Sequence, residues 1–234
     1  MFAYLGGPMF FDFQYLIWIA PALLLAFWAQ MRVKATYAQA QQMPAPLSGA
    51  AAARHILDSA GLNSVEIEQI PGELTDHYDS RAKVLRLSTE VYQSRTLAAV
   101  GIAAHESGHA LQDAVHYAPL VVRNAAVPAA QFGSPISYVL ILAGFFLQFG
   151  MLIWVGIGLF ACVVFFQVVN LPVEFNASSR AKAQLVELGI INHEELTYVN
   201  RVLNAAAWTY VAATLQSALT LLYYVSRFGG QSRN

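Results

Sequence analysis

The longest run without a charged side chain covers residues 124–173, and it limits the possible folds of this chain more than any other feature. A helix needs about 20 predominantly apolar residues to cross a hydrocarbon core roughly 30 Å thick. A run of 50 uncharged positions therefore predicts two membrane-spanning helices, at 119–147 and 151–171, joined by a short turn near the segment LQFGM.

Two further uncharged windows predict two more spans. Residues 13–31 provide 19 such positions, and residues 202–226 provide 25 with aromatic side chains towards the ends, as in an interfacial belt. Composition agrees, because 57% of the residues are hydrophobic and only 12% are charged, against about a quarter charged in a typical soluble domain. Net charge is −1, which gives no support to a nucleic-acid partner.

The distribution of basic residues predicts the orientation in the membrane. Of 13 Lys and Arg residues, eight lie in 32–123, three in 172–201, and two beyond the last predicted span. Cytoplasmic loops carry the excess of Lys and Arg, so we expect 32–118 and 172–201 to be cytoplasmic. The N-terminal segment 1–12 and the tail 227–234 would then both lie outside. A cleaved signal sequence is the alternative for 13–31, but no basic residue precedes it, which favours an uncleaved anchor.

The predicted soluble part, 32–118, contains signals for helices and a small sheet. LSGAAAARHILDSA (47–60) is typical of a helix closed by Gly61, whereas SVEIEQI and AKVLRLS alternate with the period of strands. We expect a sheet or hairpin of two strands followed by a helix from Leu97 onward. The fold class is therefore predicted to be mainly α, with about four transmembrane helices and a small zincin-like cytoplasmic α+β portion.

Residues 105–109 read His-Glu-Ser-Gly-His, the H-E-x-x-H spacing of zinc hydrolases. His105 and His109 are one helical turn apart, so both imidazoles face one side and can hold one ion. Glu106 lies beside them, as a general base for a water molecule on the zinc. Gly108 would let a partner element approach closely. The alternative is that both histidines only satisfy hydrogen bonds in a core, but this five-residue pattern seldom arises by chance.

A catalytic zinc needs a third protein ligand, and the residues just after the motif do not supply one. The metzincin pattern requires a glycine and a third histidine, at positions occupied by Gln112 and Val115, and His116 misses by one. Asp113 shares a stripe with the two histidines, but eight residues of helix span about 12 Å, too far for one ion. Asp113 is therefore expected either to orient His109 or to be solvated.

Glu174 is the next acidic residue along the chain and is the predicted third ligand. Two predicted spans separate it from His109, so the chain leaves the cytoplasmic face and returns to it. We expect one Zn²⁺ to be held by His105, His109 and Glu174, with the third ligand on a helix at 172–201. The alternative for Glu174 is an acidic residue in the first turn of a helix, favoured by the helix dipole.

Other polar residues have two open interpretations. Asn176, Ser178 and Arg180 either orient ligands and stabilise an oxyanion, or form a polar helix face. His193 follows Asn192 and predicts a capped helix start rather than a ligand.

The segment DHYD supplies a further group of polar side chains. Asp76, His77 and Asp79 form either a second ligand or substrate-contact cluster or a charged turn between strands.

Three motifs carry a resemblance to a known family: LTDHYDSRAKVLRLS, AAVGIAAHESGHALQ and NLPVEFNASSRA. With hydrophobic segments in the expected places, the chain resembles the YugP-like membrane zinc metallopeptidases of bacteria over nearly its whole length. The resemblance implies a peptidase of undefined substrate in the bacterial cytoplasmic (inner) membrane.

The zinc-binding residues are also similar, more distantly, to the gluzincin arrangement of HtpX and the CAAX prenyl proteases. There the zinc-binding Glu begins an E-x-x-A-D pattern. Glu174 and Ala177 fit that pattern, but Ser178 stands in the place of the Asp.

These observations lead to three hypotheses for the function. The first is a zinc endopeptidase that cleaves peptide or protein substrates near the cytoplasmic face, with the strand AKVLRLS docking substrate by β-addition. The second is a site-2-type intramembrane protease, disfavoured because the motif lies outside the uncharged windows and no Asp follows Asp113. The third is a scaffold or accessory protein that retains a zinc site and binds membrane-protein partners.

Overall fold

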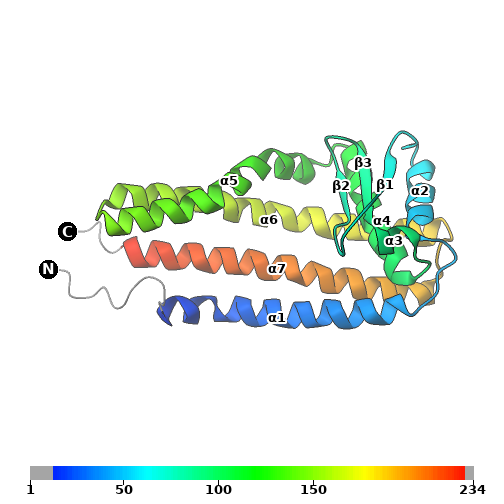
Figure 1. The fold of residues 1–234 in the computed structure, drawn as a ribbon, viewed down its shortest axis with the longest axis horizontal. Helices are drawn as coiled ribbons and strands as arrows, with labels where there is room; N and C mark the ends of the chain where they lie inside the picture. Colours follow the sequence, from blue (N-terminus) through cyan, green and yellow to red (C-terminus); the bar gives the residue numbers. More distant parts are fainter. Residues whose placement is uncertain (1–12, 230–234) are drawn as a thin grey trace. The chain divides into compact units, whose positions relative to one another are not determined.

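The computed structural model describes residues 13–229, and the predicted N-terminal segment 1–12 and the end of the tail, 230–234, lie outside them. Seven helices and three strands make up the described chain (Figure 1). In order they are α1 (Phe13–Gln41), α2 (Gly49–Ser59), β1 (Glu66–Ile70), β2 (His77–Asp79), β3 (Val84–Ser88), α3 (Thr89–Gln93), α4 (Leu97–Ala114), α5 (Ala118–Phe146), α6 (Gly150–Glu187) and α7 (His193–Gly229).

Four helices, α1, α5, α6 and α7, are long and apolar enough to cross a membrane, as the uncharged windows predicted. Their large apolar side chains are often exposed, with Leu24 71% and Val139 64% exposed to solvent, as expected for side chains that face lipid. The chain is therefore confirmed as mainly helical with four candidate spans.

Helix α6 continues past the predicted end of its span at residue 171. It runs without interruption through Pro172 to Glu187, and α7 begins only at His193. Residues 172–201 are therefore not one separate helix, because the chain turns between the two helices. Proline is tolerated within membrane helices when neighbouring groups satisfy the freed backbone carbonyl.

The start of α7 has the cap that its sequence predicted. The Asn192 side-chain oxygen accepts hydrogen bonds from the backbone N–H groups of Glu194 and Glu195, both at 2.9 Å. The Glu195 carboxylate in turn accepts one from the Asn192 N–H at 2.8 Å. This reciprocal pair is a capping box, so His193 is the first residue of a capped helix, as its sequence predicted.

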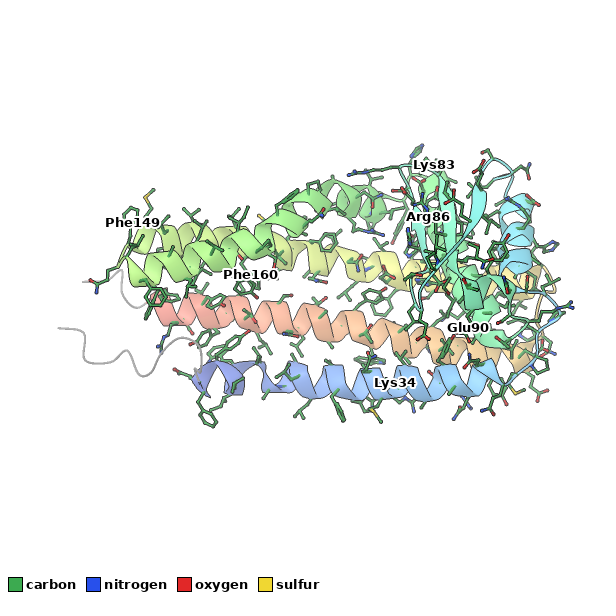
Figure 2. The ribbon with its side chains drawn as sticks, viewed as in Figure 1. Lys34, Lys83, Arg86, Glu90, Phe149 and Phe160 are labelled. Atoms are coloured by element: carbon green, nitrogen blue, oxygen red, sulfur yellow. The ribbon has the colours of Figure 1, made fainter. Side chains whose placement is uncertain are left out.

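The described residues form two compact units. The first comprises 13–28, 125–168 and 210–229. Its buried cluster is built from Ile141, Ile153, Ile157 and Phe228. Phe149, labelled in Figure 2, lies in the turn between α5 and α6, where the chain reverses as predicted.

The second unit comprises 29–124 and 169–209 and contains the three-stranded sheet. The strand order is β1-β3-β2, with β1 parallel and β2 antiparallel to β3 (Figure 1). The two-stranded expectation is therefore wrong, because the segment DHYD supplies a third strand. Because β3 is hydrogen-bonded on both edges, the predicted β-addition of substrate to AKVLRLS is also wrong.

Helix α4 carries the H-E-x-x-H motif between two hydrophobic clusters of this unit. Thr96 caps its start by accepting a hydrogen bond from the Ala99 N–H at 3.3 Å. On one side, Ala103 and Ala110 pack into the cluster that contains the sheet residues Leu85 and Leu87. On the other side, residues of α4 pack with parts of α6 and α7. The helix is thus held in position from both sides.

Candidate metal centre

The structure brings His105 and His109 of α4 together with Glu174 of α6. One ligand atom from each of the three residues lies within 4.8 Å of the others. The Glu174 Oε2 atom is 3.2 Å from His105 Nε2 and 3.7 Å from His109 Nε2. Two imidazole nitrogens and one carboxylate oxygen therefore converge on a single point.

A close helix contact makes this convergence possible. A Cβ atom at Gly108 would lie 2.5 Å from the carbonyl oxygen of Ala177, so only glycine fits there without a shift. Gly108 was expected to allow such an approach, and the partner is α6. Gly101, nearer the start of α4, also lies in a close contact. A Cβ atom there would lie 3.0 Å from the Val199 side chain of α7.

His109 is oriented by Gln112, which the sequence did not identify as a functional residue. Its Nδ1 atom lies 3.0 Å from the Gln112 side-chain oxygen. The Gln112 amide nitrogen donates to the Val173 carbonyl at 2.8 Å and to the Asn176 side-chain oxygen at 3.0 Å. Arg180 donates to the same Asn176 oxygen at 2.8 Å. Gln112 lies on the His109 face three residues on, and that spacing was the available signal.

His105 is oriented from α6. Its Nδ1 atom lies 3.1 Å from the Ser178 hydroxyl, which is buried. Ser178 stands where the related gluzincin pattern has an Asp, so a neutral hydroxyl occupies the place of a carboxylate. Both imidazoles therefore use Nδ1 for a protein partner and present Nε2 to Glu174.

Glu106 lies beside the ligand cluster on the same helix. Burial raises the pKa of its carboxyl to about 7, and the neighbouring His105 opposes this increase. The backbone N–H of Tyr78, on strand β2, is within hydrogen-bonding reach of the carboxylate. Glu106 is thus placed between the metal ligands and the edge of the sheet.

Strand β2 is fixed to α4 by its tyrosine. The Tyr78 hydroxyl donates to the Asp113 carboxylate at 2.8 Å, and Lys83 pairs with the same carboxylate. Burial and this hydrogen bond raise the pKa of Tyr78 above its usual range. Asp113 therefore anchors the strand, and the bond to the His109 ring comes from Gln112 instead. Tyr78 had no signal in the sequence beyond its place in DHYD.

The charged residues of DHYD mainly stabilise the sheet. Asp76 accepts hydrogen bonds from the Ser88 N–H at 2.7 Å and from the Ser88 hydroxyl. Asp79 accepts one from Arg86 at 2.8 Å, and backbone donors of the following turn lower the pKa of its carboxyl to about 2. His77 is exposed and contacts the Thr75 carbonyl. Figure 2 labels Lys83 and Arg86 in this part of the unit.

The three converging residues fit a zinc ion by the chemistry of their donors. When both imidazoles are neutral with the proton on Nδ1, two Nε2 lone pairs and a carboxylate oxygen are directed at one point, which is the donor set of a metal cation. Two His and one Glu form a known catalytic zinc set that leaves one coordination position open. In the part of the chain that the structure describes, no other group of His, Cys, Asp and Glu meets the same criterion.

Fold and site together define a helical protein with four candidate membrane spans and an H-E-x-x-H helix that meets a glutamate from a distant helix. Residues 15–229 match the family described as "Putative neutral zinc metallopeptidase", and the chain belongs to this family. It is 47% identical over 216 residues to the "Putative membrane protease YugP" of Bacillus subtilis (strain 168), covering 91% of this chain and 96% of that protein. No solved structure matches the chain. The resemblance seen in the three motifs is confirmed.

Proposed function

We propose that this protein is a membrane-embedded zinc endopeptidase of the gluzincin type that hydrolyses peptide bonds near the cytoplasmic face. The observation that supports it most is the convergence of His105, His109 and Glu174 within 4.8 Å, with Glu106 next to them. A purely structural zinc site has four protein ligands and needs no general base, whereas this set offers three ligands and a neighbouring carboxylate.

The chemical roles follow from the placement of each group. A zinc ion held by the two imidazoles and Glu174 would supply Lewis acidity for a substrate carbonyl and an acidified water. Glu106 would accept a proton on its carboxylate from the attacking water and return it to the nitrogen of the leaving amine. Burial raises the pKa of Glu106 towards neutrality, which suits a group that both accepts and donates a proton.

Substrate would bind along the outer edge of β2. This strand is paired only on its β3 side among the described strands, and the Tyr78 N–H lies within hydrogen-bonding reach of Glu106. An extended peptide can add to such an edge through main-chain hydrogen bonds. It would then lie with a backbone carbonyl close to Glu106 and the ligand cluster.

The location follows from the distribution of charge. Eleven of the 13 Lys and Arg residues lie in 32–123 and 172–201, the segments that carry the site. By the positive-inside rule, this distribution supports a site on the cytoplasmic side of a bacterial inner membrane, with both termini outside. Substrates would include membrane proteins with extended segments close to that surface.

The test is the variant Glu106→Gln in the purified, full-length, zinc-loaded protein. We expect cleavage of unfolded protein or peptide pools to fall by about 10²-fold or more, since general acid–base catalysis contributes roughly 10²- to 10⁴-fold. Zinc content should be unchanged. Glu66→Gln, an exposed glutamate of β1, is the matched control. Equal cleavage by wild type and Glu106→Gln would rule out the mechanism, and no cleavage by either would favour a scaffold role.

A further inference from the structure

We propose that Gln112 is a positioning residue that, with Asn176 and Arg180, fixes the tautomer of His109. In that tautomer the proton is on Nδ1 and the Nε2 lone pair faces Glu174. The inference rests on the proposed zinc site, and it concerns how the protein prepares the site before any substrate binds.

The Gln112 side chain is fully buried, and both of its polar atoms make hydrogen bonds. Its solvent-exposed fraction is 0%. The oxygen is 3.0 Å from His109 Nδ1, and the nitrogen donates to the Val173 carbonyl and to the Asn176 oxygen. A buried amide group without a hydrogen-bond partner is strongly unfavourable, so this arrangement is preferred over the flipped one, in which the NH₂ and the oxygen would face groups of their own kind.

The direction of every hydrogen bond in this network is set by its two ends. At one end the Val173 carbonyl can only accept, so the group of Gln112 that faces it must be the NH₂. At the other end the Arg180 guanidinium can only donate, so the Asn176 atom that it contacts must be the oxygen. That oxygen again requires the NH₂ of Gln112. Both ends therefore give the same orientation of the Gln112 amide.

The orientation of Gln112 then determines the proton position on His109. The Gln112 oxygen can only accept, so the His109 Nδ1 must carry a proton, and in the neutral ring Nε2 is left with its lone pair. Nε2 is the atom that lies 3.7 Å from the Glu174 carboxylate. In the neutral ring, these hydrogen bonds therefore select the tautomer that can bind a metal ion.

His105 has a different partner and serves as an internal contrast. Its Nδ1 contacts the Ser178 hydroxyl, which can either donate or accept a hydrogen bond. That contact orients the His105 ring but does not by itself determine its tautomer. Gln112 is therefore the group that makes one of the two imidazoles a ready ligand.

The first experiment reads the tautomer directly in the metal-free, full-length protein. The chain has six histidines, so ¹⁵N-histidine labelling gives a small set of imidazole signals that His109→Asn assigns by difference. In the wild type, the neutral His109 ring should carry its proton on Nδ1 and none on Nε2. Gln112→Leu should show a mixture of tautomers or the Nε2-protonated form. A predominance of Nε2-protonated His109 in the wild type would overturn the proposal.

The second experiment measures the zinc dissociation constant by competition with a chromophoric chelator. Gln112→Leu should raise it by about 10- to 100-fold, the effect typical of losing an outer partner of a ligand. Gln112→Glu keeps an acceptor for His109 but loses both donor bonds, so its constant should rise less than that of Gln112→Leu although its fold is less stable. Ser107→Ala, which removes a buried hydroxyl bonded within α4, is the control.

The two glutamine variants separate a positioning role from a structural one. If Gln112 only pinned α4 to α6, zinc affinity would follow fold stability, and both variants would weaken binding alike. That outcome, or an unchanged affinity in Gln112→Leu, contradicts the proposal. Neither readout uses peptidase activity, so failure of the proposed function in Glu106→Gln is seen separately from failure here.

Discussion

Gly108 of α4 and Ala177 of α6 are so close that a Cβ atom at position 108 would lie 2.5 Å from the Ala177 carbonyl oxygen. Gly108 immediately precedes His109, and Ala177 immediately precedes Ser178, the partner of His105. The contact therefore lies next to the ligands on both helices. It sets the separation across which α4 and α6 can share one ion.

Gly108→Ala should force the two helices apart. Overpacking of a tight contact costs about 1–3 kcal/mol, and here the obstructing atom belongs to the backbone and cannot rotate away. We expect a lower melting temperature and a zinc dissociation constant raised about 10-fold or more, as when an outer partner of a ligand is lost. Gly158→Ala on α6 meets no atom within 4 Å and should leave both quantities unchanged. Unaltered zinc affinity in Gly108→Ala would show that the contact does not set the ligand separation.

Ser178 should be required for tight zinc binding although it is not a ligand. Ser178→Ala leaves His105 Nδ1 without its partner at 3.1 Å, and we expect the zinc dissociation constant to rise by about 10-fold. Ser178→Asp restores the related E-x-x-A-D pattern and should bind zinc at least as tightly as wild type. Ser179→Ala, on the exposed side of the same turn, is the control. Equal constants for Ser178→Ala and Ser179→Ala would contradict this role.

Glu174 should matter more than any residue that acts through another. Glu174→Gln replaces a carboxylate oxygen by an uncharged amide at the point where the two Nε2 atoms converge, so zinc affinity should fall by more than the roughly 100-fold upper range for outer partners. Glu187→Gln, an exposed glutamate at the end of the same helix, should have no effect. Full zinc occupancy of Glu174→Gln after dialysis against a weak chelator would show that the third ligand lies elsewhere.

The sequence predicted the parts of this site that depend on local spacing or on topology. His105 and His109 are one turn apart on a helix, and this spacing alone places them on one face. Glu174 was predicted because few acids follow Asp113 and because two predicted spans would return the chain to the same side. The four candidate spans could also be predicted from the sequence, because long uncharged windows are compatible with few other structures.

The remaining features depend on contacts that no local pattern records. Strand β2 has three residues of turn-like composition, and only pairing with β3 makes it a strand. The parallel pairing of β1 and β3 likewise joins two segments that the sequence predicted as a two-stranded sheet or hairpin. Gln112 could be placed on the His109 face, but its orientation depends on Val173 and Arg180, which are more than 60 positions away in the sequence.

Tyr78→Phe should separate substrate docking from metal binding. The substitution removes the hydroxyl bond to Asp113 at 2.8 Å but keeps the ring in its hydrophobic cluster and the backbone N–H near Glu106. A hydrogen bond to a charged group contributes about 1.5–3 kcal/mol, and Lys83 remains to neutralise Asp113, so the loss should be near the lower end. Because β2 is then held less firmly against α4, we expect KM to rise several-fold with a smaller change in kcat, and zinc affinity to stay unchanged.

Tyr92→Phe, which changes a tyrosine packed against the same cluster, is the control. A fall in zinc affinity in Tyr78→Phe, or a loss confined to kcat, would show that Tyr78 acts on the metal ligands or on Glu106 rather than on the docking edge.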